Sequence, residues 1–192
     1  MEQRERDQVL VQFANRSCSV LVATDVAARG LDIDQLEAVI NVDVTPDTEV
    51  HVHRIGRTGR VDQAGWAFSL VSGNQMARVD NIEKALGHEI EWHTLGELQK
   101  PPGKPRPPLL PPMATLQILG GRKDKIRPGD VLGALTGEAG FSKEQVGKIN
   151  VTDTTTYVAV ERGIAREAVR KLAAGTLKGK RVKVHLLQDS AG

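Results

Sequence analysis

Three arginines at a regular spacing are the sharpest chemical feature of the sequence. Residues 53–60 read His-Arg-Ile-Gly-Arg-Thr-Gly-Arg, which places Arg54, Arg57 and Arg60 at every third position, with two glycines between them. A guanidinium group grips phosphate oxygens through two parallel hydrogen bonds and keeps its charge at physiological pH. Glycine lets a backbone approach a ligand closely because it has no Cβ. A solvated basic loop would explain the charge but not the spacing, so the segment favours a polyphosphate ligand.

A second polar segment, residues 23–33 (ATDVAARGLDI), directly follows the short apolar run SVLVA. A buried strand is the expected structure of that run. Thr24 would then lie at the carboxyl end of a strand, where parallel α/β sheets hold their ligands. Thr24 could donate to a phosphate, and Asp32 could accept from sugar hydroxyls. Taken alone, an Asx-type turn followed by a helix cap explains the segment nearly as well.

Alternating helices and strands must position both segments. Periodicity and breakers predict helices over 4–15 and 75–86, the second closed by Gly87, and strands over 19–23, 36–44 and 65–71. Short apolar strands separated by helices indicate a parallel α/β sheet.

Proline marks the clearest boundary in the chain. Residues 100–112 (KPPGKPRPPLLPP) hold seven of the nine prolines. Proline fixes φ and removes a backbone donor, so this stretch cannot be a regular helix or a central strand. A stiff, extended linker is the expected structure, with a Pro-rich ligand for a partner domain as the alternative. The predicted domains are therefore 1–99 and 113–192, joined by the linker 100–112.

The pattern after the linker differs from the pattern before it. It predicts strand 114–119, helix 128–135, strands 146–151 and 155–160, helix 165–174 and strand 181–187. The order βαββαβ is the ferredoxin-like arrangement that RNA-recognition domains use, among others.

Basic residues gather in this second part. Residues 113–192 hold 14 Lys and Arg against 8 Asp and Glu, whereas residues 1–99 hold 9 against 16. Two clusters stand out: Arg122, Lys123, Lys125 and Arg127, and then Lys178, Lys180, Arg181 and Lys183. Each alone is explained by a solvated face, but two in one small domain favour RNA contact. Phe141 and Tyr157 are the only aromatic residues after the linker, so the expected contacts are electrostatic and shape-based.

The two polar segments of the first part closely resemble motifs V and VI of DEAD-box RNA helicases. Residues 3–6 (QRER) resemble the Q-x-x-R element of the same family. The resemblance covers about residues 1–95 and implies an incomplete second RecA-like lobe. It implies that Arg57 and Arg60 reach the ATP phosphates, where such an arginine stabilises charge on the transferred phosphoryl group. It also implies that Asp32 holds the nucleotide ribose and that His53 helps to join the lobes and the site.

The same resemblance implies contacts on the RNA side. Gln3 and Arg6 match the element that touches an RNA phosphate, and Thr24, Arg29 and Gly30 match the segment that lines the RNA backbone. The later run GGRKDKIRPGDVLGAL, with VGKINV and TYVAVERG after it, resembles the C-terminal domain of DbpA-type bacterial helicases. In that family the domain recognises a 23S-type ribosomal RNA hairpin, and the helicase acts in assembly of the large subunit. The expected partners are that hairpin and a large ribosomal subunit precursor.

The sequence also departs from a complete helicase. It contains no G-x-x-x-x-G-K-[ST] phosphate loop and no D-E-A-D sequence. ATP is the expected cofactor, with Mg²⁺ held by a first lobe that this chain lacks, and no metal site is expected in the chain itself. The family is an enzyme family, but the isolated chain is expected to bind RNA without hydrolysing ATP.

Two other functions remain open from the sequence. One is a stand-alone RNA-binding module with a degenerate helicase remnant, and the other is a lobe of a DNA helicase. The single cysteine, Cys18, excludes an intramolecular disulfide and suits a reducing cytosol. No apolar run approaches the roughly 20 residues that span a bilayer. A cytoplasmic protein with no membrane partner is the expectation.

Overall fold

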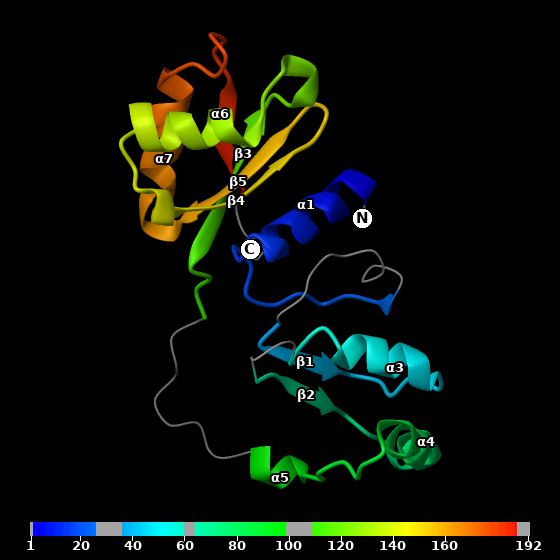
Figure 1. The fold of residues 1–192 in the computed structure, drawn as a ribbon. Helices are drawn as coiled ribbons and strands as arrows, with labels where there is room; N and C mark the ends of the chain where they lie inside the picture. The colour runs from blue at the N-terminus through cyan, green and yellow to red at the C-terminus, as the bar shows by residue number, and fades with distance from the viewer. Residues whose placement is uncertain (1, 26–35, 60–63, 99–108, 188–192) are drawn as a thin grey trace. The chain divides into compact units, whose positions relative to one another are not determined.

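The computed structural model describes residues 2–25, 36–59, 64–98 and 109–187 (Figure 1). The chain divides into two compact units. One comprises residues 1–31 together with 107–192, and the other comprises residues 32–106. They are called the RNA unit and the lobe unit below. The predicted domains, 1–99 and 113–192 with the linker 100–112 between them, divide the chain differently. Those domain limits remain a prediction.

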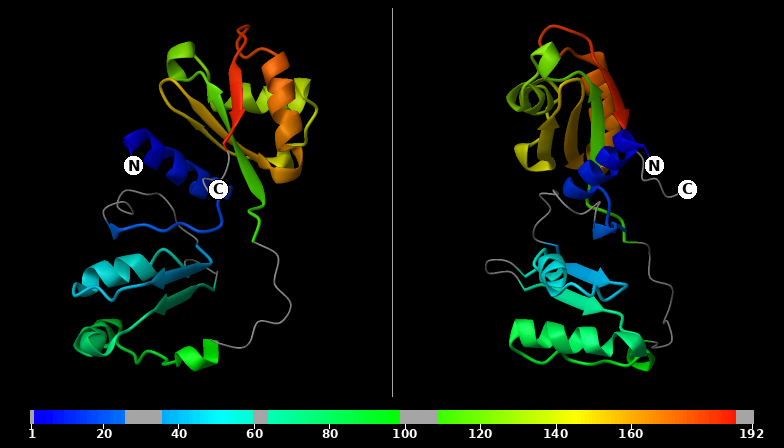
Figure 2. Two further views of the ribbon diagram at one scale, coloured as in Figure 1. Left: turned by 180° about the vertical axis from the view of Figure 1, so that it is seen from behind. Right: turned by 90° about the vertical axis from the view of Figure 1, so that its right-hand side faces the viewer.

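An antiparallel sheet forms the centre of the RNA unit. Its strands are β3 (Met113–Leu119), β4 (Val146–Val151), β5 (Thr156–Glu161) and β6 (Lys183–Leu186), in the order β4-β5-β3-β6. Helix α6 (Pro128–Gly133) follows β3, and helix α7 (Ala165–Ala174) follows β5. Figure 2 shows both helices on one face of the sheet. The predicted βαββαβ order is confirmed.

Alternating residues of the central strands build one core beneath the helices. Leu116 and Val158 are 0% exposed, and they pack with Leu135, Ala168 and Leu172 in a single buried cluster. Burial of these aliphatic side chains stabilises the unit, and the aromatic ring of Phe141 belongs to the same cluster. A π-helical turn, η3 (Ala134–Glu138), continues α6, and 3-10 turns η2 (Arg122–Asp124), η4 (Lys143–Gln145) and η5 (Arg162–Ile164) complete the connections.

The N-terminal helix packs with the RNA unit. Helix α1 (Gln3–Ala14) ends in a turn in which Asn15 Nδ2 donates to Thr115 Oγ1 at 3.1 Å. Ser17 Oγ lies 2.7 Å from the same Thr115 oxygen. The end of the predicted linker is also attached, because Arg162 Nε donates to Pro111 O at 2.6 Å. Residues 100–108 of that linker lie outside the described residues.

The lobe unit has a parallel pair of strands. Strand β1 (Ala38–Asn41) pairs with β2 (Trp66–Ser69), as the predicted parallel sheet requires. Helices α3 (Thr48–Ile55), α4 (Met76–Leu86) and α5 (Leu95–Leu98) and the 3-10 turn η1 (Gly73–Gln75) complete this unit. Helix α4 ends at Gly87, whose φ of 74° is the left-handed geometry that favours glycine at a helix end.

The predicted buried strand over residues 19–23 is wrong. The segment has no regular structure, and Val20 and Val22 are 68% and 92% exposed. A β-branched run becomes a strand only where a neighbouring backbone supplies hydrogen bonds. Within the described part of the chain, the parallel sheet consists of β1 and β2, and neither pairs with this run.

Helix α3 was not predicted, because its residues were interpreted for their chemistry alone. Its start carries an ordinary signal: Asp47 Oδ1 accepts from the backbone amides of Glu49 and Val50 at 2.9 and 3.2 Å. Among the described helices, none has the length and apolar character needed to cross a bilayer.

Candidate nucleic-acid interface

The loop after β3 is clamped against the turn that joins β4 and β5. A Cβ added at Gly121 would lie 2.3 Å from the Thr152 carbonyl oxygen, so only glycine fits there. Arg122 N donates to Thr152 O at 2.8 Å, and Lys123 N donates to Asp153 O at 3.0 Å. The glycines beside the first basic cluster therefore serve packing, and these two amides are already hydrogen-bonded.

Carboxylates occupy the two helical starts in this loop. Asp124 Oδ2 accepts from Gly121 N at 3.2 Å, and Asp130 Oδ2 accepts from Arg127 N at 2.8 Å. The short helix α6 therefore offers no open anion site at its start. Any phosphate contact in this region must come from the basic side chains.

The two basic clusters lie next to each other. Lys178 Nζ is 2.9 Å from Asp130 Oδ1, and Lys180 Nζ is 4.0 Å from Asp124 Oδ1. A small pocket between them is lined by residues of both segments, among them Gly120 and Arg181. Two segments that are far apart in the sequence thus meet through Asp124 and Asp130. The eight predicted Lys and Arg side chains of these two segments are called the basic surface.

One carboxylate beside the basic surface, that of Asp130, has a lowered pKa. The hydrogen bond from Lys178 and that from the Arg127 amide hold the pKa of Asp130 below its usual value. Arg122 is likewise paired, with Nη2 2.8 Å from Asp153 Oδ1, while its side chain stays 67% exposed. Exposed ion pairs of this kind contribute little to stability.

Two lysines of the basic surface have unusual backbone geometry. Lys125 and Lys178 have φ of 64° and 53°. Leu177 and Lys180 exchange backbone hydrogen bonds of 2.9 and 3.0 Å across a two-residue turn, so Lys178 and Gly179 both take the left-handed conformation. Asn or Gly fits such a turn with less strain.

The arginine-rich segment of the lobe unit begins inside helix α3. His53 is 73% exposed and lies 3.9 Å from Glu49 Oε1. Arg54 Nη1 donates to Asp43 O at 3.0 Å, so this arginine attaches the helix to the residues after β1. The Arg57 carbonyl accepts from Leu36 N at 3.0 Å. Arg57 is therefore fixed in the turn after the helix, next to residue 36.

The other candidate residues of the ATP site and the motif before it are only partly described. Asp32 and Arg60, predicted to hold the ribose and the phosphates, lie outside the described residues, as do Arg29 and Gly30. Thr24 is described and exposed. The geometry of the nucleotide site and of the RNA contacts over residues 24–30 stays a prediction.

The predicted Q-x-x-R element starts helix α1. Gln3 Nε2 donates to Asp7 Oδ1 at 2.7 Å, and Arg6 is half-buried. At the helix start, Glu2 N donates to Glu5 Oε2 at 3.0 Å. Acidic side chains thus occupy the amides at which an RNA phosphate was expected, so that contact would require their displacement.

Sequence reasoning missed a buried histidine beside these arginines. His51 is 4% exposed on α3, and its Nδ1 has no hydrogen-bond partner. Burial lowers the pKa of His51, and the nearby Arg54 charge lowers it further. A signal existed in the sequence, since His51 lies one helical turn from Asp47 and Ile55 on the same face.

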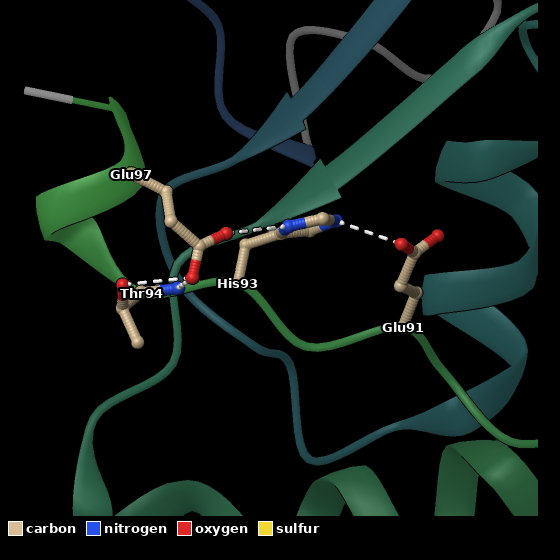
Figure 3. A network of polar contacts seen from close by, with 4 residues as sticks. All are labelled: Glu91, His93, Thr94 and Glu97. Atoms are coloured by element: carbon tan, nitrogen blue, oxygen red, sulfur yellow. Dashed lines mark hydrogen bonds and ion pairs between the residues drawn. The ribbon is translucent and has the colours of Figure 1, made fainter. Parts of the chain in front are cut away.

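A polar network precedes helix α5 (Figure 3). His93 lies between two carboxylates, with Nδ1 3.0 Å from Glu97 Oε2 and Nε2 3.4 Å from Glu91 Oε1. Glu97 Oε1 also accepts from Thr94 N and Oγ1 at 3.2 and 2.9 Å. These contacts cap the helix. No group of three or more His, Cys, Asp or Glu side chains that could hold a metal ion occurs within the described ranges.

Two parts of the chain match known protein families. Residues 1–62 match the helicase conserved C-terminal domain, and residues 115–186 match the DbpA RNA binding domain. The ATP-dependent RNA helicase DbpA of Escherichia coli strain K12 is 48% identical over 188 residues, which cover 98% of this chain and 40% of that protein. The Bacillus subtilis strain 168 protein of the same name is 32% identical, with 96% and 42% covered.

A solved structure is also similar. The E. coli DEAD-box protein SrmB, bound to regulator of ribonuclease activity A, matches with a TM-score of 0.47 and 33% identity, covering 56% of this chain and 63% of that one. The chain spans about two fifths of the length of the two DbpA relatives. An α/β lobe with parallel strands and a small βαββαβ domain agree with the two domain matches. The chain therefore belongs to the DbpA family of DEAD-box RNA helicases, a family of ATP-dependent enzymes.

Proposed function

We propose that this chain is the RNA-anchoring and arginine-bearing part of a helicase that remodels large-subunit ribosomal RNA during ribosome assembly in the cytoplasm. The observation that carries the proposal is the relative named an ATP-dependent RNA helicase, which is 48% identical across both units. The chain combines a helicase segment with an RNA-binding segment. In such a protein, the RNA-binding segment would hold the helicase next to its RNA substrate.

The basic surface would hold a structured RNA hairpin of the 23S type within a large-subunit precursor. Its cations, contributed by the loop after β3 and the turn before β6, lie on one rigid domain with a complete core. Lys and Arg side chains that neutralise phosphates release counterions, so binding should weaken steeply with salt. A hairpin tethered in this way raises the effective concentration of nearby duplexes at the lobe.

The lobe unit would supply half of an ATP site. Arg57 and Arg60 would contact the phosphates, Asp32 the ribose, and His53 the junction with a first lobe that carries the phosphate loop and the Mg²⁺ ligands. The chemistry that the bound nucleotide supplies is transfer of its γ-phosphoryl group to water. The contribution of this chain's own residues is to orient the phosphates and to neutralise charge.

The test supplies a first helicase lobe. The chain is joined to the preceding part of the E. coli relative, and ATP turnover is measured with a large-subunit rRNA hairpin. RNA-stimulated turnover is expected, and Arg57→Ala or Arg60→Ala should each reduce it by about 10³–10⁵ while sparing hairpin binding. Lys84→Ala, an exposed cation on α4, is the matched control. Turnover that persists in the Arg60→Ala variant would remove the proposed role of that arginine.

A second function is favoured by the difference between the units. Because the RNA unit has a complete core of its own, it could act as a stand-alone RNA-binding module beside a degenerate lobe. Under that reading the joined protein binds the hairpin but shows no RNA-stimulated turnover. Competition between RNA and DNA of equal sequence tests the remaining alternative, a DNA helicase lobe.

A further inference from the structure

The turn after helix α3, residues 56–59, is bonded on one side to the residue before the segment of strand β1. It is called the arginine turn below because it carries Arg57. Leu36 N donates to Arg57 O at 3.0 Å, and Thr58 Oγ1 donates to Leu36 O. The contact is a parallel β-bridge that uses both backbone polar groups of Leu36. Thr58 is 8% exposed, so its hydroxyl bond is largely shielded from water.

Gly65 closes the other side of the arginine turn. A Cβ added at this position would clash with Thr58 Oγ1 and with the backbone nitrogen of Gly59, and it would lie 3.0 Å from the Gly59 Cα. The φ of Gly65 lies outside the left-handed region, so glycine is needed there for space alone. The φ of Gly59, in contrast, is 64°, a conformation that favours glycine. The turn and residue 65 therefore fit together only without a side chain between them.

The segment before β1 also holds the start of strand β2. Trp66 N donates to Glu37 O at 3.0 Å, and β1 and β2 pair in register from there on. Leu36 thus bonds to the arginine turn, while the next residue, Glu37, bonds to the residue after Gly65. Three segments of the lobe unit are joined at this point, and the arginine turn is one of them.

The end of helix α3 does not by itself constrain the arginine turn. The helix ends at Ile55, and the amides of Arg57 and Thr58 then donate to the Arg54 and Ile55 carbonyls at 3.2 and 3.1 Å. This is the spacing of a 3-10 turn, whose hydrogen-bond geometry is poorer than that of an α-helix. Helix ends of this kind fray readily. The contacts with Leu36 and Gly65 supply the constraint that the helix end lacks.

We propose that Leu36, Thr58 and Gly65 form a clamp that fixes the backbone of the arginine turn, and that Thr58 and Gly65 are positioning residues for the phosphate contact of Arg57. The inference rests on the proposed function, which assigns that contact to Arg57. A guanidinium at the end of a long side chain reaches its target only from a correctly placed backbone, and a displacement of about 1 Å can reduce a rate by about 10². Thr58 and Gly65 act on the nucleotide only through the position of Arg57.

The first experiment uses the whole chain without nucleotide. Amide hydrogen exchange followed by NMR reports on the Leu36 and Trp66 amides. Gly65→Ala introduces the clashing Cβ. Thr58→Val removes the hydroxyl at nearly constant shape, whereas Thr58→Ser keeps it. Gly73→Ala is the matched control for the glycine, because a Cβ at that position would meet nothing within 4 Å.

Both clamp variants should expose the Leu36 amide more often. Thr58→Val and Gly65→Ala should exchange at Leu36 about fivefold faster than the parent chain, because the turn opens more readily without its side-chain bond or its close fit. Thr58→Ser and Gly73→Ala should match the parent. In Thr58→Val the Trp66 amide should keep its protection, which separates loss of the clamp from unfolding of the unit. Unchanged exchange at Leu36 in both variants, or equal acceleration at Leu36 and Trp66 in Thr58→Val, would overturn the proposal.

The second experiment measures RNA-stimulated ATP turnover in the joined protein. Thr58→Val and Gly65→Ala should lower kcat by about 10- to 100-fold while hairpin affinity stays the same, because an interaction realised in the transition state is lost. Thr58→Ser should restore most of the rate. A kcat equal to that of the joined parent in both clamp variants would refute the positioning role. If the joined parent itself has no turnover, the proposed function fails, whereas the clamp then stands or falls with the Leu36 exchange in the chain alone.

Discussion

The two units differ in how completely their side chains are buried. In the RNA unit, one cluster extends from β3 and β5 to α6 and α7, and its central members are fully buried. In the described part of the lobe unit, the buried hydrophobic side chains are Val44, Val79 and Ile82, while Ile40 and Trp66 are 65% and 67% exposed. The arginine-rich motif thus lies on the unit with the smaller described core, and the two basic clusters lie on the unit with the larger core. Motifs alone carry the chemistry of a site, but only a complete core fixes its geometry.

The first prediction tests whether the RNA unit folds by its own core. Leu135→Ala should lower its unfolding free energy by about 2–5 kcal/mol, because it leaves a cavity in a fully buried position. Tyr157 is the only tyrosine of the chain and reports on this unit, whereas Trp66 and Trp92 report on the lobe unit. Leu119→Ala, at a position of the same unit that is 42% exposed, is the control. If the tryptophan signal of Leu135→Ala showed the same loss of stability as the tyrosine signal, the two units would not unfold separately. That result would contradict the prediction.

The second prediction concerns the cap of the unpredicted helix. Asp47→Ala should destabilise the lobe unit by about 0.5–2 kcal/mol, because two backbone amides at the start of α3 lose their acceptor. Chemical unfolding followed by tryptophan fluorescence measures the loss. Asp47→Ser should restore most of it, since a serine hydroxyl can accept the same bonds. Equal losses for alanine and serine would contradict the capping role.

The third prediction concerns the pH dependence of the lobe unit. Because burial lowers the pKa of His51, the unfolded chain binds its proton more readily than the folded chain does. The stabilising contribution is complete above about pH 6.5 and is lost as the pH falls below that value. His51→Gln should flatten the slope of stability against pH. An unchanged slope in that variant would refute the buried, neutral state.

The fourth and smallest effect is local. Hydrogen bonds from His93 and Thr94 hold the pKa of Glu97 below its usual value. The cap of α5 should therefore persist above the ordinary Glu pKa of 4.5 and be lost as the pH falls further. The NMR shift of the Thr94 amide follows this change, and Glu97→Gln should abolish it. A flat titration of that amide in the parent chain would rule out the network.

Much of the RNA unit was predictable because its pattern and its packing agree. Helix α7 and strand β4 begin and end where periodicity placed them. The ion pairs of Lys178 with Asp130 and of Lys180 with Asp124 were not predicted. Asp124 lies within the first cluster, and Asp130 lies three residues after it. Periodicity identifies elements, but it does not identify which charges meet across loops.

The first 23 residues of the chain show where sequence reasoning fails. Residues 19–23 have the composition of a buried strand, yet a strand needs a neighbouring backbone, and that requirement is not visible in a local pattern. The contact of the residues after helix α1 with strand β3 was missed for a related reason. Asn15 and Ser17 are ordinary helix-end residues in sequence, and only the fold brings them to Thr115, about a hundred residues away.

The salt dependence of hairpin binding tests the central claim most directly. The affinity for a large-subunit rRNA hairpin is measured across salt concentrations for the parent chain and for Arg122→Ala with Lys180→Ala. The account predicts weaker binding and a slope of log K against log salt that is smaller by about one for each lost phosphate contact. Lys143→Ala, outside both clusters, should leave the slope unchanged. An unchanged slope in the double variant would contradict RNA binding through the basic surface.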